Sequence, residues 1–155
     1  VDNTSGVLSR VAGLFSRRGY NIDSLTVGET EHPDISRMTV VARGEDSVLE
    51  QITKQLSKLE DVKEIVELER DTSVCRELVL VKVAAGIAER TELNTIANIF
   101  RANVVDVSSE IMMMEMTGTI SKIDAFIKLL DGFEIKELVR TGITGLTRGS
   151  DSIAD

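Results

Sequence analysis

Hydrogen-bonding residues gather near the N-terminus, around a segment with the apolar spacing of an amphipathic helix. Residues 3–6 read N-T-S-G and precede this segment, and Asn21 follows it. Gly19 suits the left-handed position that ends a helix. Ser5 or Thr4 is placed to cap the start of the helix. The segment therefore predicts a helix with polar groups at both of its ends.

The start of this helix has the chemistry of an anion site. The backbone N–H groups of Gly6, Val7 and Leu8 are free to bind a carboxylate, because the first turn of a helix has unpaired donors. The side-chain amides of Asn3 and Asn21 can hold an ammonium or a carboxylate group. On the residues alone, an ordinary capped helix followed by a turn asparagine outweighs a ligand site.

Catalytic and metal-binding groups are scarce. The single histidine, His32, falls in a predicted turn, and Cys75 is the single cysteine. A nucleophile–base pair and a zinc site are therefore both disfavoured, and no catalytic or metal-ligating residue is predicted. Alternating acids at residues 29 and 31, and again at 67 and 69, are typical of a solvated strand face rather than of a magnesium site.

Two other patterns are more typical of structure than of chemistry. Met112, Met114 and Met116 share one face of a predicted strand, where methionine packs a core or a subunit contact. Arg17 and Arg18 lie near a helix C-terminus, where arginine complements the helix dipole. No phosphate-binding glycine motif is present.

Composition limits the class of protein. The 155 residues carry 42% hydrophobic and 3% aromatic residues, which predicts an aliphatic core for one medium or two small domains. The net charge of −8 disfavours binding to nucleic acid. No apolar run approaches the roughly 20 residues that a membrane span needs. With one cysteine and no disulfide, we expect a cytoplasmic protein.

Periodicity predicts two units with the same order of elements. In the first half we expect a helix at 6–18, strands at 21–31 and 35–43 joined by a turn at 32–34, a helix from 46, and a strand at 62–68. In the second half we expect a strand at 77–85, a helix at 89–102, strands at 103–109 and 111–117, a helix at 122–130, and a strand at 135–140.

This order predicts an α+β fold of two ferredoxin-like βαββαβ units, each a four-stranded antiparallel sheet with both helices on one face. The opening strand of the first unit is largely missing, and because Val1 is not an initiator methionine we expect a short N-terminal piece to be absent from this sequence. Open sheet edges predict pairing between units or subunits. We expect the tail after Gly149 to be mobile.

Specific motifs resemble a known family. N-T-S-G-V-L-S-R-V-A-G-L-F-S-R-R-G-Y-N-I-D-S-L-T-V at residues 3–27, S-R-M-T-V-V at 36–41 and Q-L-S-K-L-E-D-V at 55–62 resemble the regulatory (small) subunit of acetohydroxyacid synthase, also called acetolactate synthase. The resemblance continues more weakly through E-L-V-L-V-K-V at 77–83, D-A-F at 124–126 and G-I-T-G-L-T-R-G at 142–149.

The resemblance implies an N-terminal ACT domain over residues 1–70 and a C-terminal ferredoxin-like domain over 71–155. It implies a non-catalytic subunit that activates a large catalytic subunit and confers feedback inhibition by valine in branched-chain amino acid biosynthesis. Thiamine diphosphate, magnesium and FAD are expected in that catalytic partner, and no cofactor in this chain. The effector is expected where the ACT domains of a homodimer meet, at the positions that match the family's motif: Asn3, Gly6, Val7, Leu8, Asn21 and Ile22.

In the resemblance, Asn3 and Asn21 hold the polar end of the effector, and the amides of residues 6–8 hold its carboxylate. Isoleucine or leucine remains an alternative to valine, because an aliphatic pocket separates ligands that differ by one methylene by only about 1–3 kcal/mol. An amino-acid-sensing ACT-type transcription regulator is the alternative function, but the sequence contains no basic DNA-binding module. An autonomous enzyme is the third hypothesis.

Overall fold

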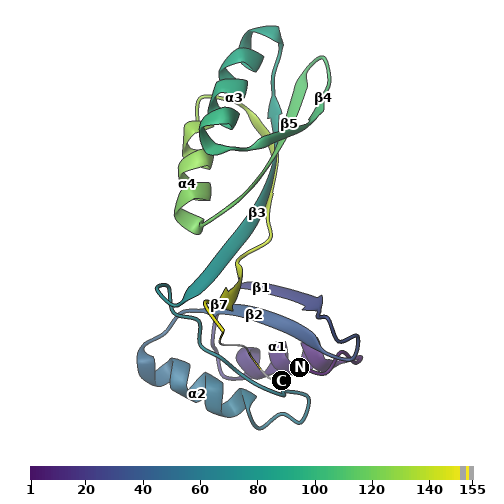
Figure 1. Cartoon of the computed structure of the whole chain (residues 1–155), viewed down its shortest axis with the longest axis vertical. Helices are drawn as coiled ribbons and strands as arrows, with labels where there is room; N and C mark the ends of the chain where they lie inside the picture. The colour runs from purple at the N-terminus through teal and green to yellow at the C-terminus, as the bar shows by residue number, and fades with distance from the viewer. Residues whose placement is uncertain (151–152, 154–155) are drawn as a thin grey trace. The chain divides into compact units, whose positions relative to one another are not determined.

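The computed structural model describes residues 1–150 and 153, and it divides into two compact units (Figure 1). The first unit comprises Val1–Val74 together with the described residues from Thr144 onward, and the second comprises Cys75–Ile143. The domain limits predicted from the family resemblance, residues 1–70 and 71–155, stay a prediction, because the two units are defined by contacts rather than by family domains. The expectation of a mobile tail falls largely outside the described residues.

The first unit places two helices on one side of a β-hairpin (Figure 1). Its elements are α1 (Val7–Arg17), β1 (Ile22–Glu29), β2 (Ser36–Ala42) and α2 (Asp46–Leu56), as the sequence periodicity predicts. The strands are antiparallel, with Thr26 opposite Thr39. The core contains the apolar face of α1 and one residue of α2: Val7, Val11, Leu14, Phe15 and Ile52.

The strand predicted at residues 62–68 is wrong, because the chain there forms no strand. In a ferredoxin-like unit the last strand pairs with the opening strand, and here the residues before α1 supply a single isolated bridge, between Asp2 and Ile35. The Asp2 N–H also donates to the Asp61 carbonyl at 2.8 Å, just before the segment predicted as a strand. Without a longer partner strand, the backbone of residues 62–68 has no ladder to join.

The second unit contains a complete ferredoxin-like sheet. Its elements are β3 (Ser73–Ala84, which begins in the first unit), α3 (Ile87–Phe100), β4 (Asn103–Val107), β5 (Ile111–Gly118), α4 (Ile120–Leu129) and β6 (Ile135–Arg140). The strand order is β4-β5-β3-β6, with antiparallel pairing throughout. The predicted α+β fold is therefore confirmed. A strand that the sequence analysis did not predict, β7 (Thr144–Thr147), pairs with β3.

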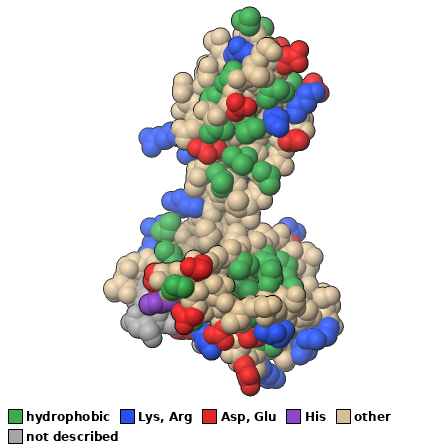
Figure 2. All heavy atoms as spheres, turned by 90° about the vertical axis from the view of Figure 1, so that its right-hand side faces the viewer, with side chains coloured by type: hydrophobic (Ala, Val, Ile, Leu, Met, Phe, Trp, Pro, Cys, Tyr) green, Lys and Arg blue, Asp and Glu red, His purple; other side chains and the backbone are tan. Residues whose placement is uncertain are grey.

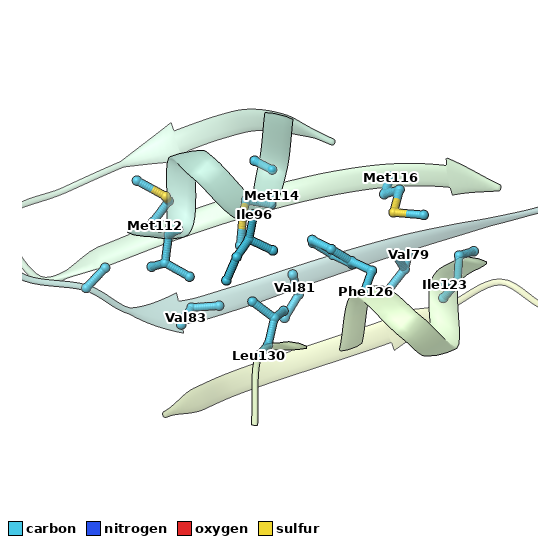
Figure 3. Packing of buried hydrophobic residues seen from close by; sticks show 13 residues of the cluster. Val79, Val81, Val83, Ile96, Met112, Met114, Met116, Ile123, Phe126 and Leu130 are labelled. Carbon is cyan, nitrogen blue, oxygen red and sulfur yellow. The ribbon is translucent and has the colours of Figure 1, made fainter. Parts of the chain in front are cut away.

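Alternating residues of the two central strands form the core of the second unit. Figure 3 shows the side chains of Met112, Met114 and Met116 lying in the same layer as those of the β3 valines, Phe126 and Leu130. Met114 and Phe126 are fully buried. The expectation that this methionine row packs the core is confirmed, because a period of two places alternate residues of β5 on one face.

An ion pair joins β3 to β6 within this unit. The Arg140 guanidinium donates to both carboxylate oxygens of Glu77, at 2.8 and 2.9 Å, and to Asp124 of α4 at 2.7 Å. The Glu77 side chain is 5% exposed. These hydrogen bonds, chiefly those to Glu77, raise the pKa of Arg140 above its ordinary value. Glu77 is therefore a buried charge with a bidentate partner, the arrangement that such a charge requires.

The sheet face opposite the helices carries charged and apolar side chains together. Lys82 on β3 contacts Glu137 on β6 at 3.1 Å, and Leu80, Met113 and Val139 line a hollow beside this ion pair. Figure 2 views this unit from the strand side and shows hydrophobic side chains interspersed with charged ones. β3 and β5 alternate between a buried face and a partly exposed face, whereas β4 is exposed along its whole length and β6 has no buried residue.

Candidate functional site

Helix α1 begins at a glycine in the left-handed conformation. Gly6 is the N-cap residue, with φ 87°, and no side chain caps the helix. The expected capping by Ser5 or Thr4 is therefore wrong, because the N-cap position belongs to a residue that has no side chain. The first intrahelical bond runs from Arg10 N–H to the Gly6 carbonyl at 3.0 Å, so the N–H groups of the first turn point out of the helix without an intrahelical acceptor.

Asn3 ties the loop before the helix to the turn of the β-hairpin. Its side-chain Nδ2 donates to the Pro33 carbonyl at 2.8 Å and to Glu29 Oε2 at 3.4 Å, and its Oδ1 accepts from the buried Ser36 hydroxyl at 2.9 Å. Its backbone N–H donates to the Asp34 carbonyl at 2.8 Å. Both N–H groups of the amide are in use, but Oδ1 keeps one acceptor position. With the Glu29 carboxylate near, this side of the loop has the chemistry to accept hydrogen bonds from an ammonium group.

Asn21 occupies the other end of α1 and has different partners. Its Nδ2 donates to Asp23 Oδ1 at 3.0 Å, and the other oxygen of Asp23 accepts from Arg43 at 2.6 Å. Asn3 and Asn21 are both exposed. The structure therefore gives each asparagine its own intrachain network, and neither amide donates to the other.

The three apolar candidates differ in what they can offer a ligand. The Val7 side chain is in the core, 2% exposed, so Val7 can offer a ligand only its backbone. Ile22 is half-buried and packs against the same core. Leu8 is 45% exposed at the first turn of α1, so its side chain is available for a further contact. The sequence analysis did not separate these three cases, because burial depends on packing against β2 and α2.

A pair of charges that the sequence analysis did not single out flanks the same loop. Arg10 on α1 donates through Nε to Asp61 Oδ2 at 2.6 Å, and Lys63 contacts Asp2 at 3.1 Å. The hydrogen bond from Arg10 lowers the pKa of the Asp61 carboxyl. Arg10 and Asp61 are separated by 51 positions in the sequence, which explains why spacing along the chain gave no signal for this pair.

The described residues contain no group of three or more His, Cys, Asp and Glu side chains placed to hold a metal ion. His32 is exposed in the hairpin turn and is the purple side chain in Figure 2. In the part of the chain that the structure describes, no helix is long and apolar enough to cross a membrane.

Comparisons with known proteins match both units. A family model described as the AHAS small subunit-like ACT domain matches residues 1–64, and one described as the small subunit of acetolactate synthase matches residues 76–149. The probable acetolactate synthase small subunit of Methanothermobacter thermautotrophicus is 56% identical over 97% of this chain and 90% of its own length. This chain belongs to the acetolactate synthase small-subunit family.

Other relatives support the same family. The acetolactate synthase small subunit of Mycolicibacterium smegmatis is 51% identical over 99% of this chain and 90% of its own length. The crystal structure of the acetolactate synthase small subunit from Thermotoga maritima superposes with a TM-score of 0.90 at 40% identity, covering 97% of this chain and 94% of that one. The resemblance read from the sequence motifs is thus confirmed, and the Thermotoga maritima small subunit has the same fold as this chain.

Proposed function

We propose that this chain is the non-catalytic regulatory subunit of an acetolactate synthase. It raises the activity of a large catalytic subunit and makes that activity sensitive to valine. Thiamine diphosphate, magnesium and FAD are expected in the large subunit, where the chemistry on pyruvate takes place. The relatives' shared description as small subunits supports this role.

The first unit has an edge suited to pairing with a second copy. β1 lies at the edge of a two-stranded sheet, and an unpaired edge strand presents backbone donors and acceptors. Val27 on β1 is 46% exposed, and its partner in register, Met38, packs against the core, so Val27 faces the helix side of the hairpin. Pairing of two copies about a two-fold axis covers this edge together with apolar groups such as Leu8 and Val27.

The observation that supports an amino acid as the ligand is the uncapped first turn of α1. Its first-turn N–H groups are suited to bind a carboxylate, and the free acceptor position of Asn3 Oδ1 suits an ammonium. An α-amino acid carries both groups, and an aliphatic side chain suits exposed apolar surface such as that of Leu8. Asn21 is proposed to contact the polar end of the ligand in the paired state.

The required affinity is modest. Valine has about eight heavy atoms, so binding in the micromolar to millimolar range, roughly −4 to −8 kcal/mol, is within reach of such a ligand. Inhibition requires valine to bind the less active assembly more tightly, with a coupling of about 1–3 kcal/mol. The site therefore does not need a deep pocket.

Calorimetric titration of valine into the full chain tests the proposal. We expect saturable binding that Asn21→Ala weakens by about tenfold, the effect of losing a hydrogen bond to a charged group. Asn94→Ala, which removes an exposed amide from α3 in the second unit, is the matched control and leaves the affinity unchanged. With the large subunit added, valine lowers turnover of pyruvate, and more valine is needed in the Asn21→Ala variant.

Two results would contradict the proposal. Absence of binding at millimolar valine, alone and with the large subunit, would remove valine as the effector. Turnover of pyruvate by this chain alone with thiamine diphosphate and magnesium would show that it is an enzyme in its own right.

A further inference from the structure

Two residues flank the loop of residues 3–6, and one acid contacts both. Asp2 precedes the loop and Arg10 follows it by one helical turn. The Asp61 carbonyl accepts from the Asp2 N–H at 2.8 Å, and the Asp61 carboxylate accepts from Arg10 Nε at 2.6 Å. Lys63 adds a contact of 3.1 Å to the Asp2 carboxylate. Residues 61–63 therefore hold the chain on both sides of the loop.

Arg10 lies directly against the glycine that starts the helix. A Cβ atom built on Gly6 would lie 2.9 Å from Arg10 Nη1 and 3.7 Å from its Cζ. The guanidinium thus covers the side of Gly6 from which a side chain would project. It places the positive member of the Arg10–Asp61 ion pair beside the glycine that starts the helix, where the helix dipole is also positive, and the Asp61 carboxylate at 2.6 Å offsets much of this charge.

The hydrogen bond to Asp61 restrains the position of the Arg10 guanidinium. The Arg10 side chain is 49% exposed, so solvent alone would leave it many rotamers, whereas the Asp61 carboxylate is 20% exposed and fixed next to the Asp2 contact. We propose that Asp61 and Arg10 are positioning residues of the effector site, which hold the 3–6 loop and the first-turn N–H groups in their ligand-binding arrangement. This inference rests on the proposed effector site but concerns residues outside the family-matched set.

Valine titration of four variants tests the inference. Asp61→Asn and Arg10→Gln are expected to weaken valine binding by up to about fivefold, the effect of a partly exposed ion pair. Asp61→Glu keeps the carboxylate and is expected to restore most of the affinity. Glu50→Gln, which removes an equal charge from an exposed pair with Lys54 on α2, is the matched control. Equal affinity in Asp61→Asn and the wild type, or an equal loss in Glu50→Gln, would overturn the inference.

Hydrogen exchange without ligand separates this inference from the proposed function. Asp61→Asn is expected to speed exchange of the hydrogen-bonded backbone N–H groups of Asp2, Asn3 and Arg10, which border the loop, and to leave those of β2 and the second unit unchanged. If the wild type does not bind valine, the proposed effector fails, and the exchange rates alone then decide the inference. Unchanged exchange at Asp2, Asn3 and Arg10, or faster exchange across the whole first unit, would show that Asp61 does not hold this loop specifically.

Discussion

At the scale of single residues, the start of α1 depends on the absence of a Cβ atom at Gly6. Its positive φ is costly for residues with a Cβ, and a Cβ would also meet the Arg10 guanidinium. At Asn3, in contrast, the side chain is what the loop requires. Its amide is hydrogen-bonded to the Pro33 carbonyl and the Ser36 hydroxyl and so joins the loop to the β-hairpin. The loop therefore needs a glycine and an amide in these two places.

Gly6→Ala is expected to lower the free energy of unfolding of the first unit by about 1–2 kcal/mol, because alanine is strained at this φ and crowds Arg10. Urea denaturation followed by Tyr20 fluorescence measures this change. The chain has no tryptophan and one tyrosine, which packs against the core of the first unit.

Gly13→Ala is the matched control within the same helix. A Cβ there meets nothing within 4 Å, so the change is expected to stabilise the helix by roughly 0.5–1 kcal/mol. If both variants shift the unfolding midpoint in the same direction, the special role of the Gly6 backbone is contradicted.

At the scale of elements, contacts that sequence periodicity cannot predict join the strands of the second unit to one another. Periodicity places Val79, Val81 and Val83 in the core, but it does not pair Glu77 with Arg140, 63 residues away. That pair joins the first residues of β3 in the second unit to the end of β6, and the Gly142 N–H also donates to Glu77 at 3.3 Å.

Glu77→Gln is expected to destabilise the second unit by about 2–3 kcal/mol. Removing a buried partner costs about 3–5 kcal/mol, and this is reduced here because Arg140 is 30% exposed and keeps Asp124. Urea denaturation followed by far-UV circular dichroism measures the loss. Glu134→Gln, from an exposed pair with Lys136, is the control and is expected to change stability by less than about 1 kcal/mol. An equal effect of the two changes would argue against a special role for the Glu77 pair.

At the scale of the whole molecule, the chain has two separate hydrophobic cores. One is built on α1 and the β1–β2 hairpin, and the other on β3, β5, α3 and α4. The chain enters the second unit after Val74 and returns to the first at Thr144, so the first unit is made of two pieces of sequence. Each unit has its own buried cluster, which predicts that a substitution in one core destabilises that unit alone.

Met114→Ala tests this separation. Met114 is fully buried, so its truncation is expected to cost the second unit about 2–5 kcal/mol. The Tyr20 fluorescence transition of the first unit is expected to stay in place, while the circular dichroism transition splits or moves to lower urea. Met113→Ala, on the opposite and half-buried face of β5, is the control and is expected to cost less. A matching shift of the Tyr20 transition in Met114→Ala would show that the two units unfold together.

The sequence by itself determined the helices, the hairpin, the buried methionine row and the family. These follow from local periodicity and from motifs such as residues 3–27, because a local pattern of residues does not depend on tertiary contacts. It also predicted that the start of α1 carries unpaired N–H groups, because every helix has them. The choice of Gly6 as the N-cap was missed, since Thr4 and Ser5 are stronger capping residues by type.

Only the tertiary structure decided the features that need a partner distant in sequence. Residues 62–68 have the pattern of a strand but form none, because a strand exists only beside another strand. The contact of Asp61 with Arg10 and the pairing of β7 with β3 likewise join residues more than 50 positions apart. Local composition sets which conformations a segment prefers, and the free energy of these distant contacts selects among them.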